Sequence, residues 1–419
     1  MVFVRHALPG EEVLARLVEA GEKDTFWRAE AIEVLTASPD RVPVRCAVAG
    51  PGGCGGCDFQ HVSVAGQRRL KASVVTEQLD RLGGVPPADL PGGPVEVEPV
   101  PGDDDGLGWR TRVRFAVDRK GRPGLRRYRS HDVVPLDECP LVHPRVAELA
   151  VPARRWTGVA EVEVVAPAHG PDRLVVVEPV PDRRADPAPM AGDTATAVRD
   201  KFGLLRLRGR TWVQEQVQVD GVVRTFRVTG SGFWQAHPGA AQTLLDAVLA
   251  AADPRPGERA LDLYSGVGLF TAGLAERVGV TGTVVGVEAD DRAAADARRS
   301  LHDLPQVQLE HGRVERVLNR MAATADQHRT DQHRTDVVVL DPPRAGAGRH
   351  VVGLITALAP RVIVYVACDP AALGRDVATA RAHGYALTGL RAFDAFPMTH
   401  HVECVATFTR YLDIKIHSR

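Results

Sequence analysis

The sequence contains no long run of apolar residues. None reaches the roughly 20 residues that a membrane-spanning helix needs, and the first residues, MVFVRH, lack the layout of a signal peptide. We therefore expect a cytoplasmic protein with no membrane contact. An excess of charge is also missing, since 52 basic residues stand against 53 acidic ones. Composition alone does not predict a nucleic-acid partner, and any basic surface must be local.

Lysine and cysteine are both scarce. Lysine occurs only at positions 23, 71, 120, 201 and 415, so arginine carries nearly all of the positive charge. The planar guanidinium suits bidentate contacts to phosphate and stacking on rings. Six cysteines in a cytoplasmic chain of 419 residues argue against a disulfide framework. They favour metal binding or catalysis.

The length of the chain predicts two or three domains. Two short strands, at 12–18 and 26–35, predict part of a small β-barrel over residues 1–43. The β-rich central domain that we expect over 44–230 begins with a cysteine segment and an amphipathic helix near 64–82.

Two changes of pattern follow that helix. Residues 86–108 are rich in Pro, Gly and Asp and read as a linker, and residues 109–230 read mostly as strands of an antiparallel sheet. From residue 231 to 419, strands and helices alternate. This alternation predicts a doubly wound α/β domain.

A glycine-rich turn lies early in the α/β domain. The segment Asp262–Phe270, DLYSGVGLF, places Gly266 and a second glycine between a strand and a helix, where backbone can closely approach a nucleotide-like ligand. Glu288 ends the next strand, where a carboxylate can accept both hydroxyls of a ribose. The pattern fits a dinucleotide or S-adenosylmethionine. Tyr264 and the missing third glycine favour the methyl donor, and a plain tight turn is the alternative.

Three further polar residues lie at strand ends in this domain. Asp341 follows the apolar strand 337–340 in Asp-Pro-Pro-Arg, and Cys368 follows a second apolar strand, directly before Asp-Pro. Strand ends of this kind border the ligand crevice of open α/β sheets, so Cys368 is a candidate nucleophile. Glu403, near the C-terminus, is a candidate proton acceptor. Each residue alone also fits a turn, core or surface role, but together they predict covalent catalysis.

A second group of cysteines lies in the central domain. Cys46, Cys54 and Cys57 fall within twelve positions amid glycines, and Cys139 follows far downstream before a proline. This is the spacing of a four-thiolate site, and either zinc or an iron–sulfur cluster would accept it. Packed free thiols explain the pattern poorly. Cys404 reads as a core residue.

The segment Trp109–Val117 alternates arginine with other residues, so one face of the expected strand is basic while the other packs. Nine cations stand against a single acid between residues 110 and 129. Backbone phosphate is a natural partner for such a face. The candidate RNA contacts are Arg110, Arg112, Arg114, Arg126 and Arg127. A solvated strand face is an equally good explanation outside an enzyme context.

Together these motifs resemble the RNA uracil-C5 methyltransferase family, whose members make 5-methyluridine in 23S rRNA and in tRNA. The resemblance spans nearly the whole chain and rests on Phe233–Gln235, Asp262–Phe270, Glu288, Asp341–Arg344, Ala367–Pro370 and His401–Glu403. It implies an N-terminal TRAM barrel, a central domain and a Rossmann-like methyltransferase domain. RNA is the implied partner of what we expect to be a monomer.

The resemblance also implies a role for individual residues. S-adenosylmethionine would be contacted by Gln235, Tyr264, Gly266, Glu288 and Asp341. Cys368 would add to C6 of uridine, and Glu403 would remove the C5 proton. In the cluster-bearing branch of the family, a [4Fe-4S] cluster would be bound by Cys46, Cys54, Cys57 and Cys139, which favours 23S rRNA over tRNA as the target.

The chain departs from the family pattern at His237, where Asn is common, and it begins inside the expected barrel. Two other functions remain open. One is an exocyclic-amine methyltransferase of RNA or DNA, which Asp-Pro-Pro resembles but which needs no thiol. The other is a cluster-bearing RNA-binding protein without catalysis.

Overall fold

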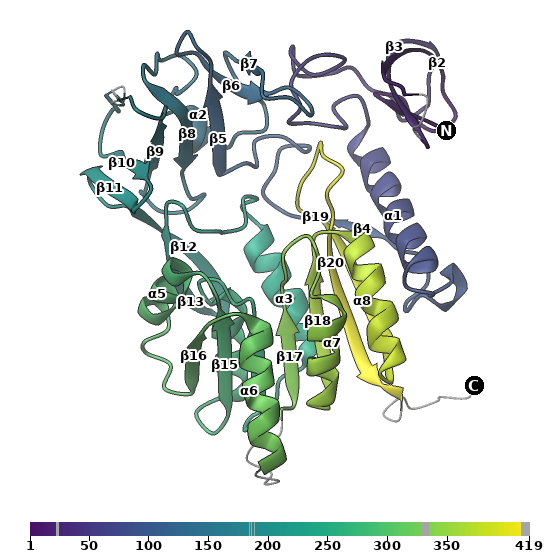
Figure 1. The fold of residues 1–419 in the computed structure, drawn as a ribbon, viewed down its shortest axis with the longest axis vertical. Helices are drawn as coiled ribbons and strands as arrows, with labels where there is room; N and C mark the ends of the chain where they lie inside the picture. Colours follow the sequence, from purple (N-terminus) through teal and green to yellow (C-terminus); the bar gives the residue numbers. More distant parts are fainter. Residues whose placement is uncertain (22–24, 184, 186, 188, 328–334, 412–419) are drawn as a thin grey trace. The chain divides into compact units, whose positions relative to one another are not determined.

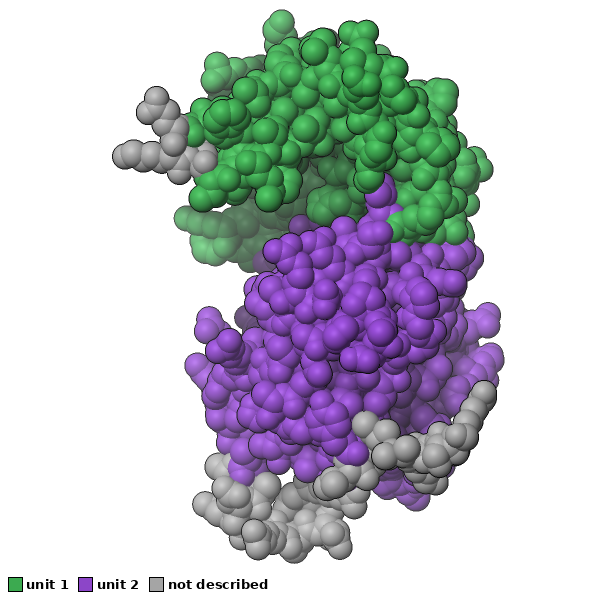
Figure 2. Space-filling model, turned by 90° about the vertical axis from the view of Figure 1, so that its right-hand side faces the viewer, with its two compact units in different colours: residues 1–69, 102–211, 396–400 green, residues 70–101, 212–395, 401–419 purple. Residues whose placement is uncertain are grey.

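The computed structural model describes residues 1–21, 25–183, 185, 187, 189–327 and 335–411. They form two compact units, each built from separated stretches of chain (Figure 2). Unit 1 comprises Met1–Arg69, Gly102–Thr211 and Phe396–His400, and unit 2 comprises Leu70–Pro101, Trp212–Ala395 and His401–Arg419. The domain boundaries predicted after residues 43 and 230 stay predictions. Among the helices of the described ranges, none has the length and apolarity to cross a membrane.

Unit 1 begins with a three-stranded sheet. Its strands are β1 (Val2–Arg5), β2 (Glu12–Glu19) and β3 (Trp27–Thr36), in the order β1-β3-β2. The pairing of β2 with β3 is antiparallel and contains three register shifts. The two strands predicted from the sequence are thus present. Their contacts within the described residues make a sheet, and the closed barrel stays a prediction.

The second sheet of unit 1 has seven strands, in the order β11-β10-β9-β8-β5-β6-β7. Its strands are β5 (Arg112–Val117), β6 (Pro123–Arg126), β7 (Val133–Pro135), β8 (Val159–Val165), β9 (Leu174–Pro179), β10 (Ala195–Asp200) and β11 (Gly203–Arg208). All neighbours are antiparallel except β9 and β10. The core of this part of unit 1 contains Val113, Phe115 and Trp156. The short helix α2 (Pro144–Ala147) contributes Val146 to the same core.

The helix predicted near 64–82 is α1 (Val64–Arg81). The prediction of a linker over 86–108 is wrong in part. This stretch holds a 3₁₀ turn, η1 (Pro87–Asp89), and the strand β4 (Val97–Pro99), which pairs in parallel with β19 (Tyr385–Asp394). A three-residue strand among prolines and glycines carries no periodic signal. It forms because a partner almost 300 positions away supplies its hydrogen bonds.

Unit 2 contains a hairpin and an eight-stranded sheet. The hairpin pairs β12 (Trp212–Val219) with β13 (Val222–Thr229). The alternating elements that follow are α3 (Ala240–Ala252), β14 (Arg259–Leu263), α4 (Leu269–Val278), β15 (Thr283–Glu288), α5 (Asp291–Ser300), β16 (Val307–His311), α6 (Val314–Gln327), β17 (Val337–Leu340), α7 (Gly348–Ala357), β18 (Val362–Ala367), α8 (Pro370–Ala382), β19 and β20 (Glu403–Arg410).

The order of this sheet is β16-β15-β14-β17-β18-β20-β19-β4. The chain proceeds outward from β14 to β16, then returns to the other side of β14 with β17. Such a switch point opens a crevice at the carboxyl ends of the central strands. Helices α6, α7 and α8 lie in front of the sheet in Figure 1. The prediction of a doubly wound α/β domain is confirmed.

Candidate active site

The glycine-rich turn and Glu288 meet at the carboxyl ends of β14 and β15. Glu288 Oε2 accepts a hydrogen bond from Gly266 N at 2.8 Å, and Oε1 accepts from the backbone N–H groups of Ala289 and Asp290 at 2.7 and 2.6 Å. These donors fix the carboxylate in the crevice. Gly266 has a φ of +56°, and a Cβ placed on it would meet no atom within 4 Å. The turn therefore leaves open space on this side for a ligand.

Two other residues predicted to contact the methyl donor are Tyr264, within this turn, and Gln235, elsewhere in unit 2. Tyr264 follows β14 with a φ of +64°, a strained value for a residue with a side chain, and burial raises the pKa of its hydroxyl to about 12. Gln235 lies between β13 and α3 and is 7% exposed. Its side-chain carbonyl oxygen has no hydrogen-bond partner among the described protein atoms. A buried amide oxygen in this state suits a polar group of a ligand.

Two carboxyl groups lie near the carboxyl ends of adjacent parallel strands, and the second of them, Asp341, is half-buried. Asp262 of β14 is fully buried, and its Oδ2 accepts from the Thr271 hydroxyl at 2.5 Å. Burial, with the negative charge of Glu288 as the smallest contribution, raises its pKa to about 7. Asp341, which directly follows β17, also has its pKa raised to about 7, by burial first and by the charge of Asp262 second. The sequence analysis assigned no role to Asp262, although a carboxyl inside an apolar strand was a visible signal.

Cys368 and Glu403 lie at the same end of two neighbouring strands. In the antiparallel pairing of β18 with β20, Ala367 faces Cys404, so Cys368 and Glu403 are next along the ladder. Cys368 is partly exposed, whereas Glu403 is 4% exposed. Burial, then the charges of Glu403 and Asp341, raises the pKa of the thiol to about 11. Burial, then the charge of Asp341, raises the pKa of Glu403 well above its usual range.

A cation that the sequence analysis left without a role acts on the same groups. Arg344, the last residue of Asp-Pro-Pro-Arg, lowers the pKa of both Cys368 and Glu403 by its charge, against the effect of burial. Its Nη2 lies 3.0 Å from His401 Nε2. Because arginine only donates, this contact makes His401 Nε2 the acceptor. The position of Arg344 directly after Asp-Pro-Pro was the available signal.

The four cysteines predicted to form a site line one small cavity in unit 1, with Leu125, Leu136 and Leu141 among its other walls. Backbone pairing shapes this cavity, since Gly55 N donates to Arg126 O at 2.9 Å. A Cβ on Gly55 would lie 2.6 Å from Tyr128 N, so this position requires glycine. Across the described ranges, no three His, Cys, Asp or Glu side chains are arranged to hold a metal ion. Cys404 is fully buried in unit 2, as predicted.

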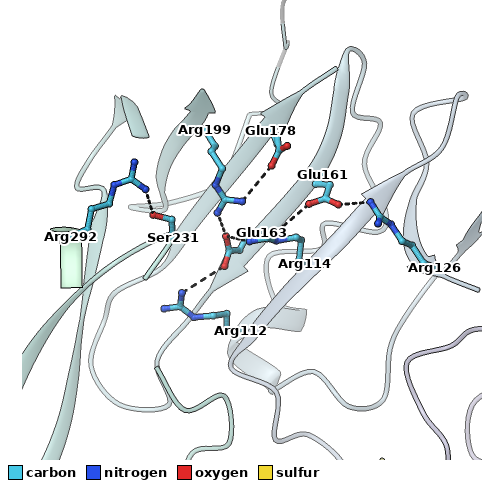
Figure 3. A network of polar contacts seen from close by, with 9 residues as sticks. All are labelled: Arg112, Arg114, Arg126, Glu161, Glu163, Glu178, Arg199, Ser231 and Arg292. Carbon is cyan, nitrogen blue, oxygen red and sulfur yellow. Dashed lines mark hydrogen bonds and ion pairs between the residues drawn. The ribbon is translucent and has the colours of Figure 1, made fainter. Parts of the chain in front are cut away.

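The predicted basic face of β5 exists, but carboxylates cover it. Val113 and Phe115 point into the core, while the arginines on the other face contact Glu161 and Glu163 of β8 (Figure 3). The pairs are Arg112–Glu163 at 3.7 Å, Arg114–Glu163 at 3.4 Å, Arg114–Glu161 at 3.5 Å, Arg126–Glu161 at 2.7 Å and Arg199–Glu163. Sequence reasoning missed Glu161 and Glu163, which lie almost 50 positions after the arginines of β5.

Arg110 and Arg127 lie outside this network. Arg110 precedes β5, its backbone bonds to Leu141 and His143, and its charge acts on Cys54, Cys57 and Cys139. Arg127 has no ion-pair partner in the described part of the chain.

Arg127 also lines a groove of about 1210 Å³ in unit 1. The other lining residues include Arg5, Tyr128 and Arg129, and the Arg5 guanidinium stacks on the Tyr128 ring at 3.5 Å. Glu19 and Glu30 also line the groove and pair with Arg129 and Arg5. Arginine and aromatic rings in one groove suit a nucleic-acid strand.

The mixed sheet with its switch point, the glycine turn and the acidic strand ends define a methyltransferase fold. Comparison with known proteins agrees with this class. A family model described as tRNA (Uracil-5-)-methyltransferase matches residues 205–411. The crystal structure of the Pyrococcus abyssi tRNA (uracil-54, C5)-methyltransferase superposes with a TM-score of 0.70, over 97% of this chain and 95% of that one. At 24% identity, this likeness shows the fold alone.

Two relatives show the family. A protein of Streptomyces avermitilis described as an uncharacterized RNA methyltransferase is 48% identical over 97% of this chain and 92% of its own length. The 23S rRNA (uracil(1939)-C(5))-methyltransferase of Alkalilimnicola ehrlichii is 34% identical over 98% of this chain and 92% of its own. The chain belongs to the RNA uracil-C5 methyltransferase family, as the sequence motifs predicted.

Proposed function

We propose that this enzyme methylates C5 of uridine in RNA through a covalent intermediate on Cys368. The observation that carries the proposal is the placement of Cys368 and Glu403 at the same end of paired strands, with Asp341 and Arg344 acting on both. Uracil C5 is too weak a nucleophile to attack a methyl group unaided. Addition of a thiolate at C6 creates an enolate with electron density at C5, which removes this difficulty.

Cys368 acts in the first step of the reaction and Glu403 in the last. The Cys368 thiolate forms a bond to C6, and the ring becomes an enolate whose negative charge Arg344 is placed to offset. S-adenosylmethionine, when bound, supplies the methyl group that C5 receives. Glu403 then takes the C5 proton, the C6–S bond breaks, and the thiolate leaves with the electron pair of that bond. The positive charge of Arg344 favours the ionised forms that both residues need.

The residues around the crevice fit this cofactor. The fixed carboxylate of Glu288 is suited to ribose hydroxyls. Gly266 leaves room for close approach, and the unpaired carbonyl oxygen of Gln235 suits a polar group of the amino-acid portion. We assign Tyr264 and Asp341 to the same ligand. An extruded uridine is required as well, because C5 and C6 must both be reached.

We infer that the four cysteines of unit 1 bind a [4Fe-4S] cluster. Their support is the donor set itself, four thiols around one cavity: Cys46, Cys54, Cys57 and Cys139. If bound, such a cluster would be held by one thiolate from each of these four cysteines. Bound there, the cluster would tie the cysteine loop to the segment around Cys139.

We propose 23S rRNA as the target, because the Alkalilimnicola ehrlichii relative is described as acting on it. Ribosomal RNA as substrate implies a cytoplasmic enzyme. The RNA strand would follow the groove with Arg127 and Tyr128, and the N-terminal sheet would belong to a TRAM-like barrel beside it. Arg112, Arg114 and Arg126 would contact phosphate only in competition with Glu161 and Glu163.

Tritium release tests the proposed reaction. RNA labelled at uridine C5 is incubated with S-adenosylmethionine and the wild type, Cys368→Ala or Glu403→Gln. Release by the wild type alone supports C5 methylation through these two residues. Methyl incorporation without release would move the chemistry to another atom, and full activity of Cys368→Ala would exclude the covalent route.

A further inference from the structure

One buried carboxylate in unit 2 joins three elements around the thiol. Asp376, on α8, is 4% exposed. Its carboxylate accepts hydrogen bonds from Ala347 N at 2.8 Å, from Gly348 N at 3.1 Å and from the Tyr365 hydroxyl at 2.7 Å. The Tyr365 hydroxyl itself accepts from Ala347 N at 3.1 Å. The start of α7, strand β18 and helix α8 therefore meet at a single group.

The segment held at this point is the end of a turn that matters for catalysis. It begins at Asp341 and contains Arg344, and it ends where α7 begins at Gly348. The first N–H groups of a helix need an acceptor from outside the helix. The N-cap residue, Ala347, has no side chain that can serve, so Asp376 caps α7 from another helix. A negative charge at this end also suits the helix dipole.

Gly346 shows that the turn packs flush against α8. Its φ is +88°, and a Cβ added to it would lie 2.8 Å from Asp376 Oδ2 and 3.2 Å from Ala372 Cβ. No side chain fits between the turn and the helix. The turn consequently has little freedom to shift while the hydrogen bonds to Asp376 are intact.

The other two elements carry the nucleophile. Tyr365 lies three residues before Cys368 on β18, and α8 begins at Pro370, two residues after the thiol. Asp376 thus connects the segment that presents the thiol to the turn that presents Asp341 and Arg344. Small errors in such an arrangement are costly, since a displacement of about 1 Å can lower a rate roughly 100-fold.

We propose that Asp376, together with Tyr365, is a positioning residue that holds the Asp341–Arg344 turn in register with the Cys368 thiol. The inference rests on the proposed methylation reaction. Asp376 acts through the turn. It fixes the positions from which Arg344 and Asp341 face the thiol.

The test compares Asp376→Asn and Tyr365→Phe with the matched control Asp296→Asn. Asp296, on α5, is 2% exposed, and its carboxylate accepts from Thr229 N at 2.8 Å and from the Thr229 hydroxyl at 2.6 Å. Like Asp376 it is buried and accepts from a backbone N–H and a hydroxyl, and it also pairs with Arg227 Nε at 2.8 Å. Three quantities are measured for each full-length variant: the melting temperature, kcat and KM with RNA, and the rate of Cys368 alkylation by iodoacetamide as a function of pH, followed on the Cys368 peptide.

We expect Asp376→Asn to lower kcat by roughly 10- to 100-fold, with little change in KM. The alkylation profile of Cys368 should move to higher pH, because a displaced Arg344 no longer lowers the pKa of the thiol. Tyr365→Phe should change both quantities in the same direction by less. Asp296→Asn should lower the melting temperature and leave both unchanged.

The proposal is wrong if Asp376→Asn and Tyr365→Phe behave like the control. Both variants would then have a lower melting temperature but an unchanged kcat and an unchanged alkylation profile of Cys368. Should Asp376→Asn fail to fold, Tyr365→Phe decides the question, since it removes one hydroxyl only. A wild type that does not methylate RNA would overturn the proposed function instead. The alkylation profiles would then still show whether Asp376 governs the surroundings of the thiol.

Discussion

Arg344 donates from Nη2 to Nε2 of His401 at 3.0 Å, so the turn after β17 is joined to the residue two positions before the candidate base. This contact has two consequences. It requires His401 to be unprotonated at Nε2, and it holds a guanidinium beside the thiol and carboxyl groups whose pKa values it lowers. Arg344 and Glu403 thus act on Cys368 with opposite signs.

Replacing Arg344 by Gln should raise the pKa of the Cys368 thiol further, because the positive charge of Arg344 favours the thiolate. Each unit of upward shift lowers the thiolate fraction at neutral pH about tenfold. Alkylation of Cys368 by iodoacetamide at pH 8 should slow accordingly, and kcat should fall with it. An unchanged alkylation rate would mean that Arg344 does not govern the ionisation of the thiol.

Replacing Glu403 by Gln should have the reverse effect on the thiol. The negative charge of Glu403 raises the pKa of Cys368, so its removal lowers that pKa and speeds alkylation. Turnover should nevertheless be lost, since no group takes the C5 proton. A covalent RNA–protein complex should accumulate and be visible on a denaturing gel. Tritium release at the wild-type rate would contradict the assigned role of Glu403.

Asp262 should make the stability of the ligand-free protein depend on pH. Its pKa of about 7 lies above the value for an unfolded chain, so its stabilising effect is complete at low pH and is lost as pH rises toward 7. Between pH 5 and pH 8 we expect the free energy of unfolding to fall by on the order of 2 kcal/mol from this group. Urea titrations of the wild type and Asp262→Asn test this, and the variant should show the smaller pH dependence.

The two arginines Arg127 and Arg114 should differ in their contribution to RNA binding. Arg114 is paired with Glu161 and Glu163, whereas Arg127 lines the groove of unit 1. Arg127→Gln should reduce the slope of log K against log salt by about one phosphate contact. Arg114→Gln serves as the matched control and should change it less. If both variants reduced the slope equally, Arg114 would have to exchange its contacts with Glu161 and Glu163 for a contact with the RNA.

Protein isolated without oxygen should be brown and contain iron. Cys54→Ser should lose the colour and most of the iron, since Cys54 lines the four-thiol cavity. Cys404→Ser is the matched control, because Cys404 is also buried but lies in the core of unit 2, so its replacement should not affect iron content. Colourless protein with stoichiometric zinc would contradict the cluster.

The sequence by itself determined the regular parts of the α/β domain and singled out the candidate residues at its strand ends. The strand at 337–340 was predicted with the bounds that β17 has, because an unbroken apolar run fits only a strand buried on both faces. Cys368 and Glu403 were found in the same way, as polar residues where apolar strands end or begin. Local patterns of this kind are readable because period and strand length are properties of consecutive residues.

Only the tertiary structure decided what depends on distant partners. The strand β4 exists because β19 pairs with it, and the basic face of β5 is covered because Glu163 and Glu161 of β8 lie opposite its arginines. The contact of Arg344 with His401 joins residues 57 positions apart. In each case the energy comes from pairing across the fold, which no short window of sequence records.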